Sequence, residues 1–324
     1  MTEAQERDER RAWFQDVCSR LHAKYADLDE GVPADYIPEL ADVDPELFAI
    51  AGVTADDRHI DVGDCDHEFT IQSISKLMLY GLALEEHGRD HVLARVGVAP
   101  TGESFNSILL DEADNRAPNP MVNAGAIAVT DMVPGADRDA RIERVRRMYE
   151  RYLGRRPEID SDVWASERET GNRNRAIAYL MLNQGIISDR VEETLDLYFG
   201  QCSVLVTVDD LALIGATLAN YGRHPRTGEQ VVRPEVARDM LTVALTCGMY
   251  DYAGEWAYSV GTPAKSGVGG GIVGMIPGIG GVAVFSPRLD EHGNSVRGLR
   301  TFEELSAEFG MHLFDPERPW RRDR

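Results

Sequence analysis

The chain has 324 residues, of which 43% are hydrophobic and 27% are charged, and its formal net charge is −21. This composition is typical of a globular protein rather than a disordered one, and there is no apolar run of the roughly 18 residues needed to cross a membrane. The acidic balance excludes a general binder of nucleic acids or of anionic membranes, since either would need the opposite charge.

The N-terminal part of the chain predicts a helix followed by strands. Apolar residues recur at helical spacing over 11–28, and the two prolines of 31–40 indicate irregular structure. Residues 73–88 predict a further helix that begins at a serine and ends at a glycine. Between them we expect two strands and a short extended segment, at 47–53, 58–63 and 68–72.

Helical patterns dominate from about residue 90 to residue 246, and strands return after residue 250. Thr207 and Asp209 offer capping at the start of one of these helices. The expected helices are 123–133, 136–154, 173–185, 189–202 and 207–222. The expected strands are 255–261, 271–277 and 281–287, and a last helix covers 301–314.

Strands at both ends of the chain, with helices between them, predict an α/β (α+β) fold. The two ends would share one antiparallel sheet flanked by the terminal helices, and the middle would be an inserted, all-helical subdomain. We expect one domain over 1–324, with a sheet-and-helix lobe from 1–72 plus 250–324 and a mainly helical lobe from 73–249.

The basic residues show a strong preference for arginine. Of 34 basic residues only three are lysines: Lys24, Lys76 and Lys265. Arginine keeps its proton in proteins, whereas a lysine can lose it when its pKa is depressed. A lysine retained in such a chain is therefore a candidate for proton-transfer chemistry.

Lys76 follows Ser73 by three residues, so a helix would place both side chains on one face. A neutral lysine can take the serine proton and activate the hydroxyl as a nucleophile. The alternative is that Ser73 only caps the helix and Lys76 is only a surface charge.

Lys265 begins a K-S-G motif, and serine hydrolases of the penicillin-recognising type combine S-x-x-K with K-T-G or K-S-G in this order. The pair of motifs therefore favours a serine acyl-enzyme.

The remaining motifs give little evidence for any other kind of functional site. The run Gly269–Gly274 fits a dinucleotide fingerprint, but Pro277 and further glycines follow it, so no helix opens there. The glycines are better explained by close approach of a backbone strand to the site. The four cysteines form no C-x-x-C pair and the histidines form no metal motif, so we expect free thiols and no metal.

At these residues the sequence resembles the serine-dependent glutaminases, which have a β-lactamase/DD-peptidase-like fold. The resemblance spans about residues 31–300 in one order. The stretches that carry it are ADYIPEL (34–40), FTIQSISK (69–76), FNSI (105–108), NPMVNAGAI (119–127), SERETGNRNRAIAY (166–179), LYFGQCS (197–203), CGMYDYAG (247–254) and PAKSGVGGGI (263–272).

The resemblance implies hydrolysis of L-glutamine to L-glutamate and ammonia without a cofactor. Ser73 would be the nucleophile, Lys76 its base, and Tyr250 a proton shuttle. The N–H groups of Ser73 and Val268 would form the oxyanion hole, with Tyr36 beside the reaction centre. The implied substrate-binding residues are Tyr36, Gln72, Asn123, Glu167, Asn174, Tyr198 and Val268.

Two alternatives stay open at this point: a peptidase or β-lactamase-type hydrolase with the same nucleophile, and a non-catalytic protein that binds an amino acid. Taken alone, Glu167 is expected to be a helix-capping carboxylate in a loop-like context, and each Asn or Tyr a structural group. We expect a cytoplasmic protein without a signal peptide, with no nucleic-acid or membrane partner. The family resemblance also implies a homodimer or homotetramer.

Overall fold

A computed structural model describes residues 3–102, 107, 110–111 and 115–316. Most of the FNSI segment (105–108) lies outside the described residues. No helix in the described part of the chain combines the length and the apolar character needed to pass through a bilayer.

The centre of the molecule is a five-stranded antiparallel sheet in the order β2-β1-β7-β6-β5. Its strands come from both ends of the chain, as predicted, because β1 pairs with β7 along its whole length, from Ala49 opposite Phe285 to Thr54 opposite Gly280. The strands are β1 (Ala49–Thr54), β2 (His59–Gly63), β5 (Ala264–Ser266), β6 (Gly271–Ile276) and β7 (Gly280–Phe285).

One face of the sheet is covered by α10 (Val208–Ala219). The Thr207 side chain caps this helix by accepting from the N–H of Asp210, while the Asp210 carboxylate accepts from Thr207. Gly215 and Gly281 face each other across the contact, and a Cβ on Gly281 would lie 2.3 Å from the carbonyl oxygen of Ala212. These two glycines therefore let the helix lie directly on the strands.

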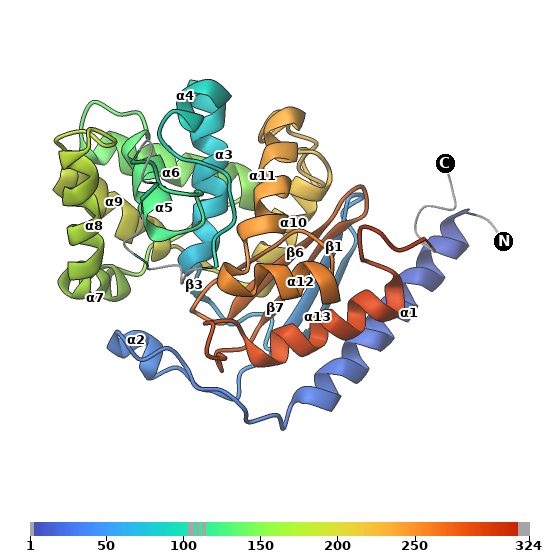
Figure 1. The fold of residues 1–324 in the computed structure, drawn as a ribbon. Coiled ribbons are helices and arrows are strands. Elements are labelled where there is room, and N and C mark those ends of the chain that lie inside the picture. Colours follow the sequence, from blue (N-terminus) through green and yellow to red (C-terminus); the bar gives the residue numbers. More distant parts are fainter. Residues whose placement is uncertain (1–2, 103–106, 108–109, 112–114, 317–324) are drawn as a thin grey trace.

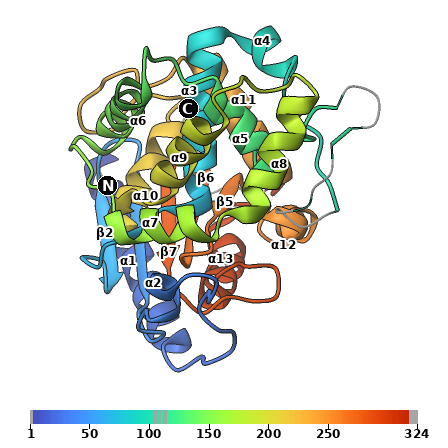
Figure 2. The ribbon, with the colours of Figure 1, turned by 90° about the vertical axis from the view of Figure 1, so that its left-hand side faces the viewer.

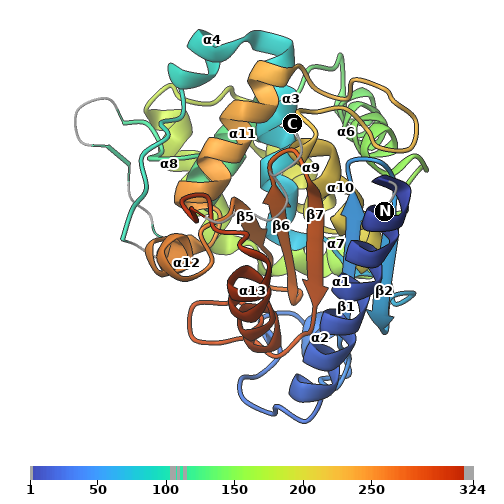
Figure 3. The ribbon, with the colours of Figure 1, turned by 90° about the vertical axis from the view of Figure 1, so that its right-hand side faces the viewer.

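The opposite face is covered by the two terminal helices, α1 (Glu3–Tyr25) and α13 (Val296–Phe309), which lie beside each other (Figure 3). The Phe309 ring lies 4.4 Å from that of Trp13 and 4.9 Å from that of Phe14. This face holds its own hydrophobic cluster, separate from the larger core on the α10 side.

The remaining helices form a body next to the sheet, on the left in Figure 1 and facing the viewer in Figure 2. Two short strands, β3 (Phe69–Thr70) and β4 (Leu205–Val206), pair at its base. The helices of this body are α3 (Ser75–His87), α4 (Arg89–Leu93), α5 (Asn123–Asp131), α6 (Arg138–Leu153), α7 (Ser161–Thr170), α8 (Asn172–Asn183), α9 (Val191–Cys202) and α11 (Pro234–Cys247). The short α2 (Pro38–Ala41) packs against α7, and α12 (Ala253–Ser259) packs against α11.

Two elements predicted in the C-terminal part of the chain differ in the structure. The expected strand 255–261 is mostly the helix α12, in which Trp256 packs on Phe302 while Tyr258 is exposed. In the sequence, Trp256, Tyr258 and Val260 alternate with smaller residues, which imitates the period of a strand with all three on one face. The last helix begins at Val296 rather than 301, because Ser295 caps it by accepting from the N–H of Gly298, and it ends before Gly310 at a φ of 60°.

Candidate active site

Ser73 lies on a tight turn between a strand and a helix. The chain leaves β3, forms the 3₁₀ turn Gln72–Ile74 and enters α3 at Ser75. Gln72 has a φ of 49°, a left-handed conformation that is costly for a residue with a side chain and that concentrates at functional sites. Ser73 therefore precedes the α-helix instead of starting it, and no side-chain cap is present at that end of α3.

Lys76 lies in the first turn of α3, and its side chain is buried. Its Nζ donates to Asn123 Oδ1 at 2.7 Å and to the carbonyl oxygen of Met121 at 3.2 Å. Burial lowers the pKa of Lys76 to about 8. The interpretation of Lys76 as a surface charge is therefore wrong.

Asn123 carries this hydrogen-bonded chain further from Lys76. It is the first residue of α5, and its Nδ2 donates to Asn174 Oδ1 on α8 at 3.0 Å. The loop before Asn123 is held by Asn119, whose Oδ1 accepts from the N–H of Met121 at 3.0 Å and of Val122 at 3.2 Å. The acceptor oxygens around the lysine are thus fixed by buried amides.

Glu167 lies on α7, buried, and it is bonded to Tyr36. The Tyr36 hydroxyl donates to Glu167 Oε1 at 2.6 Å and lies 3.4 Å from Gln72 Oε1. Burial raises the pKa of Glu167, while hydrogen bonds from Tyr36 and Gln72 and the charge of Lys76 oppose that shift. The expectation of a capping carboxylate in a loop is wrong, because α7 is instead capped by Asp160.

Tyr36 lies between the site and solvent. Its ring is 46% exposed, yet its hydroxyl reaches the buried carboxylate of Glu167. Burial of that hydroxyl and the charge of Glu167 raise the pKa of Tyr36 well above its usual value. The residue therefore forms one wall of the site and stays a hydrogen-bond donor.

Tyr250 meets Ser73 from the side of the sheet. A hydrogen bond with Ser73 partly offsets the raised pKa that burial gives the phenol, and the hydroxyl donates to the carbonyl oxygen of Ser266 at 3.2 Å. Like Gln72, Tyr250 has a left-handed φ, here 57°. Gln72, which precedes Ser73 in the chain, and Tyr250, which contacts it in space, are thus both held in unusual backbone conformations.

Lys265, on β5, lies beneath Tyr250. Its Nζ is 4.1 Å from the centre of the Tyr250 ring and donates to the carbonyl oxygens of Gly248 at 2.9 Å and Ser266 at 2.6 Å. Burial and the nearby charge of Lys76 lower its pKa well below the usual value. Two lysines of low proton affinity therefore lie on either side of the reaction centre.

The glycine-rich turn after β5 packs against the segment that carries Ser73. A Cβ on Gly267 would lie 3.0 Å from the carbonyl oxygen of Ile71, and one on Gly269 would lie 2.9 Å from that of Thr70. A strand, β6, follows this turn where a dinucleotide site would need a helix. The close approach inferred from the sequence is thus present, and it places Val268 beside this turn.

Tyr198, on α9, is buried, and that burial raises the pKa of its phenol well above the usual value, with smaller contributions from Cys202, Glu167 and Tyr250. The structure therefore brings the ten predicted residues into one region. Sequence analysis did not include Lys265 and Ser266 among the site residues, although the K-S-G motif contained them. No sequence pattern distinguished Asn119, or Cys202, whose thiol lies 3.7 Å from Ser75 Oγ.

Comparisons with known proteins match almost the whole chain to glutaminases. The family model described as Glutaminase matches residues 31–314. A glutaminase of a Nostoc species is 58% identical over 299 residues, covering 92% of this chain and 90% of the relative. A glutaminase of Microcystis aeruginosa is 55% identical over 308 residues, covering 95% and 91%.

Solved structures agree as well. A probable glutaminase, ybaS, superposes with a TM-score of 0.89 at 39% identity, covering 93% of this chain and 97% of that one. Mglu in its glutamate form superposes with a TM-score of 0.90 at 43% identity, covering 94% and 70%. These similarities favour a glutamine-hydrolysing protein over a β-lactam hydrolase or a non-catalytic binding protein.

Proposed function

The chain belongs to the glutaminase family, has its β-lactamase-like fold and hydrolyses L-glutamine to L-glutamate, and from this premise we propose that the reaction proceeds through an ester on Ser73. The supporting observation is the buried Lys76, whose pKa is lowered to about 8, one helical turn after a serine that is hydrogen-bonded to Tyr250. A base of this pKa is partly neutral near neutral pH, as proton abstraction requires.

In the proposed acylation, neutral Lys76 takes the proton of the Ser73 hydroxyl while Oγ forms a bond to the side-chain amide carbon of glutamine. The carbonyl oxygen becomes an oxyanion, which the N–H groups of Ser73 and Val268 stabilise. Each such donor is worth roughly 10²–10³ in rate. The strained Gln72 fixes the direction of the Ser73 N–H in advance.

Breakdown of the tetrahedral intermediate requires a proton on the leaving nitrogen. Tyr250 delivers it, the C–N bond breaks and ammonia departs. Lys265 Nζ lies 4.1 Å from the Tyr250 ring and donates to the carbonyl oxygen of Ser266, to which the Tyr250 hydroxyl also donates, so it helps to hold the phenol in position for this transfer. Water then attacks the ester, deprotonated by the Tyr250 phenolate or by Lys76 once Lys76 has passed its proton to that phenolate. As glutamate leaves, the remaining extra proton returns to Ser73 Oγ, which restores the starting state.

The amino-acid end of the substrate is a zwitterion, so a buried site must satisfy both charges. Glu167 accepts from the ammonium group. Asn123, Asn174 and Tyr198 are neutral donors for the carboxylate, while Tyr36 and Gln72 hold the Glu167 carboxylate in place. The proposed chemistry needs no metal or organic cofactor.

The experiment that tests the ester is trapping of the acyl group. Hydroxylamine should compete with water and convert part of the product to γ-glutamyl hydroxamate. Acid quenching during turnover should leave a glutamyl adduct on the peptide that contains Ser73, detectable by mass spectrometry. Ser73→Ala should lose both signals. Ser75→Ala, a matched change two residues away, should retain them, and an adduct that persists in Ser73→Ala would contradict the proposal.

We further propose that the two lobes, 1–72 plus 250–324 and 73–249, act as one domain, because the site draws residues from both.

A homodimer or homotetramer is supported by the exposed aromatic side chains of Tyr258 and Phe314, which are 89% and 84% accessible. A cytoplasmic location is supported by four unpaired cysteines. Light scattering coupled to size-exclusion chromatography tests the oligomeric state.

A further inference from the structure

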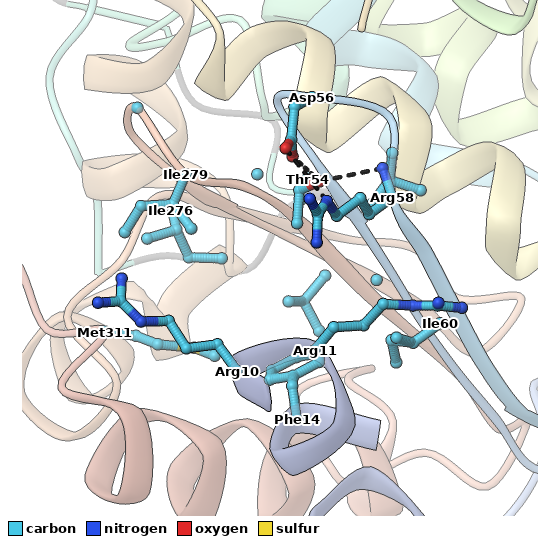
Figure 4. Close-up of a pocket in the computed structure, with 16 residues that line it drawn as sticks. Arg10, Arg11, Phe14, Thr54, Asp56, Arg58, Ile60, Ile276, Ile279 and Met311 are labelled. Carbon is cyan, nitrogen blue, oxygen red and sulfur yellow. Dashed lines mark hydrogen bonds and ion pairs between the residues drawn. The ribbon is translucent and has the colours of Figure 1, made fainter. Parts of the chain in front are cut away.

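A second pocket lies on the α1 face of the sheet, away from α10 and Ser73. Its volume is about 290 Å³, and it opens between the first half of α1, the β1–β2 hairpin and the β6–β7 turn (Figure 4). This is near the lower end of the volumes of small-molecule pockets. None of the residues assigned to glutamine hydrolysis lines it.

The walls of this pocket, here called the α1 pocket, are apolar. Aromatic and aliphatic side chains from four segments converge on it, namely Phe14, Ile60, Ile276, Ile279, Val282 and Met311. Gly52 contributes no side chain to the same wall, and a Cβ there would lie only 3.0 Å from the Phe14 ring. Glycine at this point of β1 therefore lets the Phe14 ring close this wall of the pocket.

The rim is basic, in contrast to the rest of the chain. Three arginines line the pocket, Arg10, Arg11 and Arg58, against one carboxylate, Asp56, in a protein of net charge −21. Figure 4 shows Arg10 extending to one side of the pocket and Arg11 to the other, with Arg58 next to Thr54 and Asp56. A cationic rim over an apolar floor favours a ligand that has an anionic head group and an apolar body.

The rim side chains are oriented by contacts with the protein. Arg58 Nη1 donates to Asp8 at 2.9 Å and its Nε lies 3.2 Å from Asp56. Arg11 Nε donates to the carbonyl oxygen of His59 at 3.2 Å. A guanidinium has five N–H donors, so one that is anchored through Nε still presents its terminal nitrogens to an anion.

We propose that the α1 pocket binds a small amphipathic carboxylate, with a hydrocarbon body of about eight carbons on the apolar floor and its carboxylate at the arginine rim. Guanidinium and carboxylate match in charge and planar geometry. Burial of the hydrocarbon supplies the rest of the affinity. Free glutamine fits poorly, because it lacks an apolar body and carries an ammonium group that the rim repels.

The test is calorimetric titration of the full-length protein with octanoate, in the presence of saturating L-glutamate so that the catalytic site is filled. Octanoate should bind the unmodified protein, and octylammonium, which has the same chain but the opposite charge, should not. Arg11→Glu should weaken octanoate binding about tenfold or more. Arg20→Glu, the same charge reversal on α1 outside the pocket, should leave it unchanged.

A second variant tests the apolar floor independently. Gly52→Leu, checked for folding by circular dichroism, should fill the cavity and also abolish octanoate binding. No octanoate binding to the unmodified protein, equal binding of octylammonium, or unchanged binding to Arg11→Glu would each overturn the proposal. If octanoate does not bind at all, the cavity is a gap in packing between α1 and the sheet.

Discussion

The catalytic site and the α1 pocket lie on opposite faces of one sheet and use cations in opposite ways. In the catalytic site the cations are lysines that are fully enclosed, and their pKa values are lowered by burial. In the α1 pocket the cations are arginines at the rim, in contact with solvent and with exposed carboxylates. Enclosure gives a group that can exchange a proton, whereas exposure on an arginine gives a permanent charge.

Glycines also serve different purposes in the two regions. Around Ser73, Gly267 and Gly269 allow one backbone to approach another within contact distance. On the α1 face, Gly52 instead lets the side chains of Phe14 and Ile60 pack closely against β1. The first arrangement fixes the position of reacting groups, and the second closes the apolar wall of a pocket.

The largest expected effect comes from removing the proton-transfer pair. Ser73→Ala and Lys76→Arg should each reduce turnover roughly 10⁴-fold or more, since these residues act as one unit. Ammonia release is the measurement, and circular dichroism checks that each variant folds, because an arginine at the buried position of Lys76 carries a permanent charge. Near-normal release by Lys76→Arg would show that a removable proton at this position is not needed.

A core change on the opposite face should separate stability from chemistry. Phe309→Ala removes a fully buried ring that packs on Trp13 and Phe14, and should lower the free energy of unfolding by about 3–5 kcal/mol. Urea denaturation measures this loss. The kcat of the folded fraction should not change, and a parallel fall in kcat would mean that the two faces are coupled.

Neutralising the buried carboxylate should affect binding of the substrate. Glu167→Gln keeps the shape of the side chain but removes the charge that meets the ammonium group, so KM should rise about 10–100-fold. Steady-state kinetics measure this ratio. Glu169→Gln, an exposed position on the same helix, is the matched control, and an equal effect there would exclude a specific role for Glu167.

The pH dependence of kcat/KM should reflect the titration of two buried groups, Lys76 and Glu167. Lys76 must be neutral to act as a base, so kcat/KM should fall about tenfold per pH unit below its pKa of about 8. Glu167 must be charged, and its pKa is raised, so acid conditions should cause a second loss. The pH profile of Glu167→Gln should keep the first loss and lack the second.

The smallest expected effect concerns Tyr36. Tyr36→Phe removes the 2.6 Å hydrogen bond to Glu167, and KM should rise about fivefold because water can replace part of it. Since that bond lowers the pKa of Glu167, its loss should also move the acid limb of the profile to higher pH. An unchanged acid limb would contradict the assigned contact.

Much of the fold followed from local patterns. The helix over α3, the paired strands β1 and β2, and the β6–β7 hairpin depend on periodicity and on turn residues that act over a few positions. The error at 255–261 arose because Trp256, Tyr258 and Val260 repeat at the two-residue period of a strand, although the structure buries Trp256 and exposes Tyr258. Only the packing of Trp256 on Phe302 distinguishes helix from strand there.

By itself, the sequence determined which residue types were available for chemistry: a serine, two lysines in known motifs, and the glycines that allow close approach. The tertiary structure alone decided their properties. Lys76 and Lys265 have low proton affinity because segments far apart in the chain enclose them, and Glu167 reaches Tyr36 over 131 positions of sequence. Burial is a property of the whole fold, so no local pattern contains it.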